Sequence, residues 1–181
     1  MGMSEFKEVM ADFSQLGSLA LKGVVSAPWI DLWLRIGPPP AKWTAVLTSL
    51  FQFMVVIWGF NFWSNMDIGK LNIRIKAALG VFCVGLISSL FLTAVFTVSP
   101  GEGRERVIKG WILRDDVRPL IKPSYSPEQA LRDSEYDPNT VWTTASVATM
   151  RILLTVVWLG TFSSCAGYLT GFIIIQRRHS T

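Results

Sequence analysis

Three long stretches of the chain contain no charged residue, and each is long enough to cross a membrane. They run from Trp43 to Met66, from Ala77 to Gly101 and from Ile152 to Gln176. An α-helix rises about 1.5 Å per residue and the hydrocarbon core is roughly 30 Å thick, so about 20 apolar residues suffice to span it. Lipid offers the backbone no hydrogen-bond partner, so each stretch is expected to be helical. The pattern predicts an all-α, multi-pass membrane helical bundle.

Burial inside a large soluble protein is the alternative explanation of such stretches. One apolar helix fits that explanation, but three in a chain of 181 residues leave too little polar chain to surround them. Composition agrees with the membrane interpretation, because 50% of the residues are hydrophobic and 17% are charged, against about a quarter charged in soluble domains.

Residues 1–42 show a different pattern, typical of amphipathic helices that lie in the membrane plane. Phe6, Met10 and Phe13 repeat at helical spacing, with acidic residues on the other side. A second short helix is predicted after Pro28. The alternative is a fourth span over residues 14–36, which is costly because Lys22 and Asp31 would enter the bilayer.

The remaining boundaries follow the charges. Residues 43–98 are expected to hold the first two spans, joined by a short basic link that contains Lys70, Arg74 and Lys76. Residues 99–142 are predicted to form a polar extramembrane loop, residues 143–176 the third span and residues 177–181 a basic tail. Within the loop, the sequence from Ser126 to Gln129 is typical of a capping box, and the short helix that it starts should end near Tyr136.

Small residues on the predicted spans mark candidate helix-packing surfaces, since they let a second helix approach closely. Gly167 and Gly171 form a GxxxG pair, and Gly85 with Ser89 is a weaker version on the second span. The full candidate set is Gly160, Ser163, Ser164, Gly167, Gly171, Gly85 and Ser89. The sequence leaves two uses open: packing within one chain, and association with a partner subunit or a second copy.

Tryptophans and one arginine are candidate contacts to the bilayer surface. Trp29, Trp33, Trp43 and Trp63 are expected to be interfacial anchors. Arg151 lies about two turns inside the third span. It is a candidate lipid-headgroup contact, although snorkelling of its side chain to the interface is the simpler explanation.

The charge pattern favours one orientation over its inverse only slightly. The net charge is +4, and the basic residues flank the spans, which indicates membrane topology signals and no nucleic-acid partner. The basic link and basic tail are expected on the cytoplasmic side of an inner or plasma membrane, in preference to an organelle membrane. The loop holds basic residues of its own, which weakens this prediction.

Several catalytic arrangements are missing from the sequence. It contains one histidine, His179, and two cysteines in different spans, Cys83 and Cys165, so a haem held by two histidines or a metal cluster is not expected within one chain. None of the three charge-free stretches contains an acid, whereas proton-coupled transporters usually need one. Asp115 and Asp116 are adjacent, but arginines beside them favour ion pairing over metal binding. No cofactor and no enzymatic activity are predicted.

These expectations lead to a non-catalytic membrane subunit that assembles with other membrane proteins. The main alternative is a homo-oligomeric pore or membrane-disrupting effector with a polar seam, and a lesser one is an enzyme acting on lipid at the interface. The seam would use Gln52, Asn61, Thr93, Thr97, Ser163 and Thr170.

Overall fold

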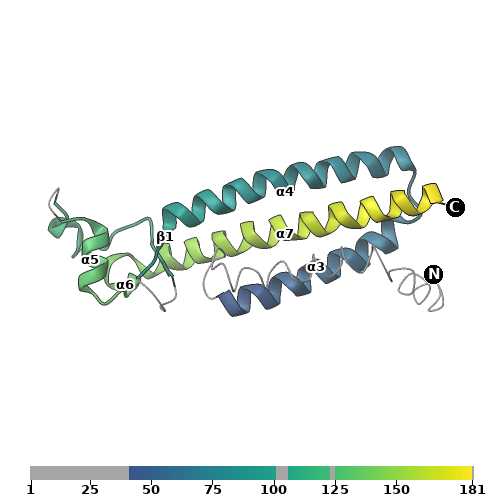
Figure 1. Ribbon diagram of the computed structural model, residues 1–181. Coiled ribbons are helices and arrows are strands. Elements are labelled where there is room, and N and C mark those ends of the chain that lie inside the picture. The colour runs from purple at the N-terminus through teal and green to yellow at the C-terminus, as the bar shows by residue number, and fades with distance from the viewer. Residues whose placement is uncertain (1–40, 101–105, 123–124, 181) are drawn as a thin grey trace.

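Three long helices form the body of the protein, and a small folded cap lies at one end of them (Figure 1). The computed structural model describes residues 41–100, 106–122 and 125–180. Helices α3 (Ala41–Trp63), α4 (Ile68–Phe96) and α7 (Thr144–Ser180) are each long and apolar enough to cross a membrane. The all-α bundle with three spans is confirmed. The predicted in-plane helices and the alternative span over residues 14–36 lie outside the described residues.

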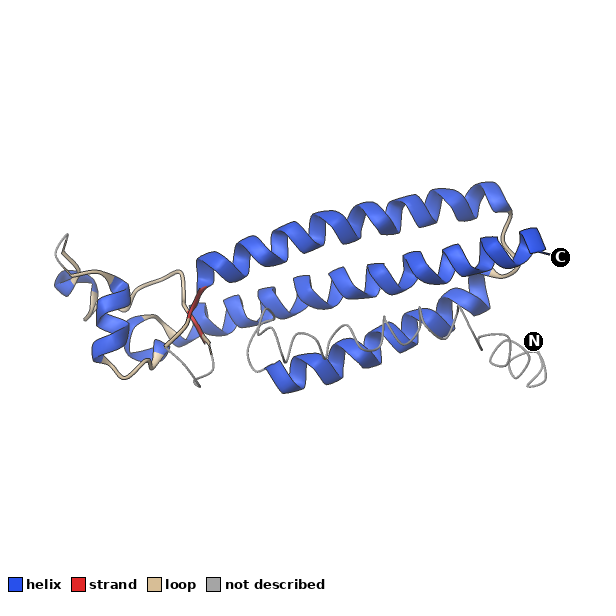
Figure 2. Cartoon of the chain, viewed as in Figure 1, coloured by secondary structure: helices blue, strands red, loops and turns tan. Residues whose placement is uncertain are grey.

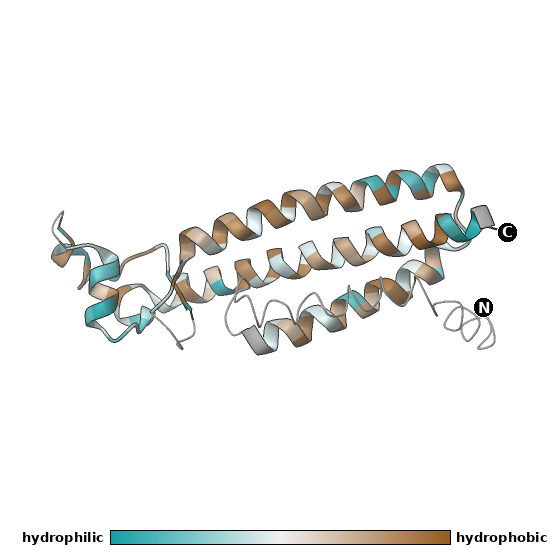
Figure 3. Cartoon of the chain, in the orientation of Figure 1, coloured by the Kyte–Doolittle hydropathy of each residue, from teal (hydrophilic) through white to brown (hydrophobic). Residues whose placement is uncertain are grey.

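Helix α7 lies between the other two long helices (Figure 1). Its contacts with α4 and with α3 account for most of the packing among the three. Hydropathy follows this arrangement: apolar residues cover the middle of the bundle, and polar ones gather at the turn between α3 and α4 and in the cap (Figure 3). The middle helix therefore positions both of its neighbours.

The second span begins earlier than the sequence indicated. Lys70, Arg74 and Lys76 lie inside α4, not in a link before it, and the link itself is residues 64–67. Asp67 starts the helix because its carboxylate accepts a hydrogen bond from the Gly69 N–H (2.9 Å), the usual role of an N-cap residue. Charge ended the apolar stretch but not the helix, since Lys and Arg are good helix formers.

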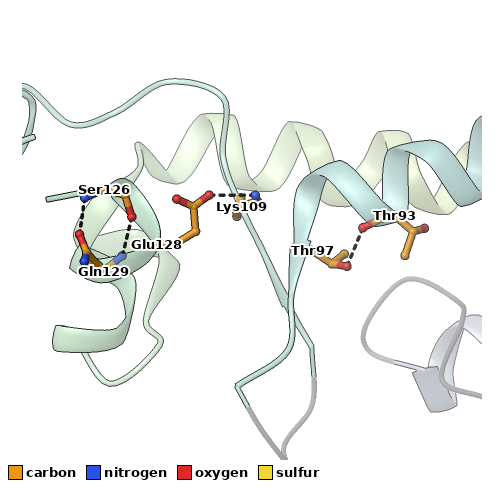
Figure 4. Close-up of polar contacts among 6 residues, drawn as sticks. All are labelled: Thr93, Thr97, Lys109, Ser126, Glu128 and Gln129. Carbon is orange, nitrogen blue, oxygen red and sulfur yellow. Dashed lines mark hydrogen bonds and ion pairs between the residues drawn. The ribbon is translucent and has the colours of Figure 1, made fainter. Parts of the chain in front are cut away.

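The cap is built from short elements between α4 and α7. Strands β1 (Thr97–Val98) and β2 (Val107–Ile108) pair antiparallel (Figure 2), and a 3-10 turn follows at Arg118–Leu120. Helix α5 (Pro127–Asp133) has the predicted capping box, in which Ser126 Oγ accepts from the Gln129 N–H and Gln129 Oε1 accepts from the Ser126 N–H (Figure 4).

The cap shares its core with the start of α7. Leu131 of α5, Val141 of helix α6 (Pro138–Val141) and Trp142 are buried together with Val147 of α7. Helix α5 ends at Asp133, before the predicted Tyr136, because Glu135 and Tyr136 adopt positive φ angles of 56° and 66°. A segment of this size cannot bury a full core alone, so the first turns of α7 complete it.

Candidate assembly interface

The GxxxG pair of α7 faces the chain's own bundle. A Cβ placed on Gly167 would lie 3.6 Å from the Trp63 ring and 3.7 Å from Val55 of α3. A Cβ on Gly171 would press against Ile75 of α4 and lie 3.4 Å from Trp63. These two glycines let α3 and α4 approach α7 closely near the turn that joins them, so intrachain packing accounts for both.

The weaker small-residue pair on α4 also packs within the chain. A Cβ on Gly85 would collide with the hydroxyl of Thr161 and lie 3.3 Å from its Cβ. Ser89, one turn later, is 3% exposed. The contact between α4 and α7 is therefore close over these turns, and a larger side chain at position 85 requires Thr161 or the helix that carries it to shift.

Gly160 and Ser164 have different surroundings from the other candidates. Gly160 is exposed, and a Cβ placed there would meet no atom within 4 Å. Ser164, one turn along, is partly exposed, and its Oγ donates to the Gly160 carbonyl (2.8 Å). Ser163 is also partly exposed. Within the described residues, the middle helix thus carries a small-residue step, formed by Gly160 and Ser164, that α3 and α4 leave uncovered at Gly160 and partly uncovered at Ser164.

Hydroxyl groups inside the spans are mostly bonded to their own helix. The hydroxyls of Thr48, Thr161 and Thr170 each donate to the carbonyl four residues earlier, over 2.7–2.8 Å. This local bond removes the cost of placing a hydroxyl in lipid. These three threonines therefore need no polar channel to explain them.

The anchor tryptophans divide into two groups. Trp43 is 71% exposed at the start of α3, as suits an interfacial residue, but Trp63 at the other end is only 6% exposed. Its ring packs with Leu71, Ile75 and Ile174. Trp63 ends its helix at the predicted place, yet it serves the core of the bundle. Trp29 and Trp33 lie outside the described residues.

Two arginines of α7 lie near its opposite ends. Arg151, the candidate headgroup contact, is exposed. Arg178, expected from the sequence only as part of a basic tail, donates to the carbonyls of Met66 (2.6 Å), Ser64 and Trp63. The last carbonyls of a helix lack partners within it and carry partial negative charge, so Arg178 fastens α7 to the end of α3. A basic residue at a helix end facing a short turn is the only sequence signal for this contact.

Of the two adjacent acids of the cap, Asp116 forms an ion pair with Arg114. Arg114 Nε and Nη2 donate to both carboxylate oxygens of Asp116 (3.0 and 2.8 Å). The hydrogen bond from Arg114 holds the pKa of Asp116 below its ordinary value. Across residues 41–100, 106–122 and 125–180, no group of three or more His, Cys, Asp or Glu side chains is placed to hold a metal ion.

Comparisons of the chain with protein families, with curated proteins and with solved structures find no match.

Proposed function

We propose that this protein is a non-catalytic membrane subunit that assembles with other membrane proteins through α7. The observation that carries the proposal is the uncovered step at Gly160 and Ser164 on the middle helix. Association of helices in lipid depends on close packing, because lipid tails are as apolar as the side chains. A small-residue surface that α3 and α4 leave open is therefore suited to a helix from another protein.

The pore alternative gains less support from the arrangement. Of the six residues that would line its polar seam, Gln52, Thr93 and Thr170 are buried within the single chain. The Thr97 hydroxyl donates to the Thr93 carbonyl (Figure 4). Side chains that already pack inside one copy are not available to line a channel shared between copies, which favours the subunit role.

We propose that the protein lies in an inner or plasma membrane. In the orientation that we propose, the turn at residues 64–67 and the C-terminal end of α7 are in the cytoplasm. Basic residues flank both, as the positive-inside rule requires. Labelling of Asn65→Cys and Ser99→Cys variants, each in a background without Cys83 and Cys165, tests this orientation in intact cells. An impermeant thiol reagent should modify position 99 and not position 65, and the opposite result would invert the topology.

Substitution of the open glycine tests the assembly proposal. Gly160→Ile should remove the chain from its complex, because the larger side chain fills the step, and its Cβ meets no atom of the neighbouring described residues within 4 Å. Gly80 on α4 is equally open, so Gly80→Ile is the matched control and should keep the complex. The readout is the size of the detergent-solubilised assembly and the proteins that purify with it. An unchanged complex for Gly160→Ile would reject this surface.

A further inference from the structure

Contacts between the long helices fix which residues lie at the same depth in the membrane. Gly171 of α7 meets both Ile75 of α4 and Trp63 of α3, so these three residues share one level. Arg151 lies 20 residues before Gly171 on α7, which is about 30 Å along a helix and equals the thickness of the hydrocarbon core. A bilayer that has one surface at Arg151 therefore has its other surface near the level of Ile75.

Basic residues of α4 gather at the second of these surfaces. Arg74 and Lys76 flank Ile75 in the sequence, and Lys70 precedes Arg74 by one helical turn; all three side chains are exposed. Lys70 and Arg74 share one side of the helix at the spacing of four residues. Lys76 projects from the other side of the buried Ile75. Figure 3 shows hydrophilic residues gathered at this end of α4.

Among the described residues, acids do not balance the charge at this end. Residues 64–76 and 176–178 contain five basic residues and a single acid, Asp67, whose carboxylate caps α4. Arg178 is held by the carbonyls at the end of α3. By contrast, residues 106–122 and 125–142 of the cap contain six basic and six acidic residues, and Lys109 pairs there with Glu128 (3.2 Å; Figure 4). The described residues at the two ends of the bundle therefore differ in charge.

We infer that the first two turns of α4 bind the headgroups of anionic phospholipids in the leaflet on the turn side. Lys70 and Arg74 together contact one phosphate, for which the forked guanidinium of arginine is well shaped, and Lys76 contacts a second lipid on the other side of α4. The depth of Ile75 places these cations at the headgroup layer and directs the site to lipid instead of to a soluble phosphate. The inference does not depend on the assembly proposal, which concerns the charge-free middle of α7.

Native mass spectrometry of the full chain tests the inference. The protein is equilibrated with equal amounts of phosphatidylglycerol and phosphatidylcholine in mild detergent, and the lipids that stay bound are counted. Each basic residue near an anionic surface contributes roughly a fivefold preference, so the triple variant Lys70→Gln/Arg74→Gln/Lys76→Gln should lose the preference for phosphatidylglycerol by at least about tenfold. The single variant Arg74→Gln should lose part of it.

A matched control removes the same charge from the cap. Arg118, Lys122 and Arg132 are exposed there, so Arg118→Gln/Lys122→Gln/Arg132→Gln should bind phosphatidylglycerol like the unmodified protein. Equal binding of the two lipids by the unmodified protein would overturn the inference, as would an equal loss in both triple variants. Displacement of phosphatidylglycerol by millimolar inorganic phosphate would also overturn it, because it would assign the cluster to free phosphate.

Discussion

Two glycines on α4 give the most direct measure of how tightly the helices pack. Gly85 lies against Thr161, whereas a Cβ placed on Gly80 would meet no atom within 4 Å. Gly85→Val should lower the thermal unfolding temperature in detergent, at a cost of about 1–3 kcal/mol for an overpacked contact. Gly80→Val adds the same side chain on an open surface and should have a much smaller effect. Equal effects would show that α4 does not pack on α7 through Gly85.

Arg178 supplies a second residue-scale prediction. Arg178→Gln should lower the unfolding temperature, because hydrogen bonds from a charged group contribute about 1.5–3 kcal/mol and the carbonyls of Trp63, Ser64 and Met66 lose this charged donor. Arg178→Lys keeps the charge near the end of the helix but loses the planar guanidinium group. Its unfolding temperature should therefore lie between those of the unmodified protein and Arg178→Gln. If Arg178→Lys is as unstable as Arg178→Gln, the charge at that helix end contributes nothing.

At the scale of elements, the start of α5 carries a pH dependence. Hydrogen bonds, first from its own backbone N–H and then from Lys109, hold the pKa of Glu128 below its ordinary value of 4.5. A carboxyl whose pKa is lowered by folding stabilises the fold above its unfolded pKa and loses that contribution as the pH falls through the folded value. Hydrogen exchange of α5, corrected for intrinsic rate, should therefore show more opening below about pH 4.5.

The variant Glu128→Gln separates this carboxyl from the others of the cap. It should open α5 more at neutral pH and lack the extra opening that Glu128 causes in acid. Asp116→Asn is the control, because the pKa of Asp116 is also lowered but its partner Arg114 lies outside α5. If α5 in Glu128→Gln still opens in acid as much as in the unmodified protein, the Glu128 carboxylate does not contribute to the stability of α5.

The sequence predicted some ends of these helices correctly and others not. The capping box at Ser126 was readable because the residues that form it lie within one turn. The start of α4 at Ile68 was missed, since the charge-free stretch begins only after Lys76, whereas the helix begins nine residues earlier than that stretch, directly after its N-cap residue Asp67. The end of α5 was placed too late, because positive φ angles at Glu135 and Tyr136 are uncommon for residues other than glycine and leave no mark in the sequence.

At the scale of the whole molecule, the number and location of the spans followed from hydropathy, but the faces of the helices did not. Small residues at 85, 160, 167 and 171 look alike in the sequence. The structure packs three of them inside the chain and leaves Gly160 open, a distinction that depends on where α3 and α4 lie around α7. The burial of Trp63 could not be predicted for the same reason, since position along a helix does not reveal which side its neighbours cover.

The composition of the complex purified in mild detergent from cells that express the protein at its natural level is the most direct test of the central claim. Native mass spectrometry of that complex should find a defined number of copies of this chain together with other membrane proteins. A closed ring made of this chain alone would support the pore alternative, and a lone chain of 20.2 kDa would contradict the proposed role as a subunit.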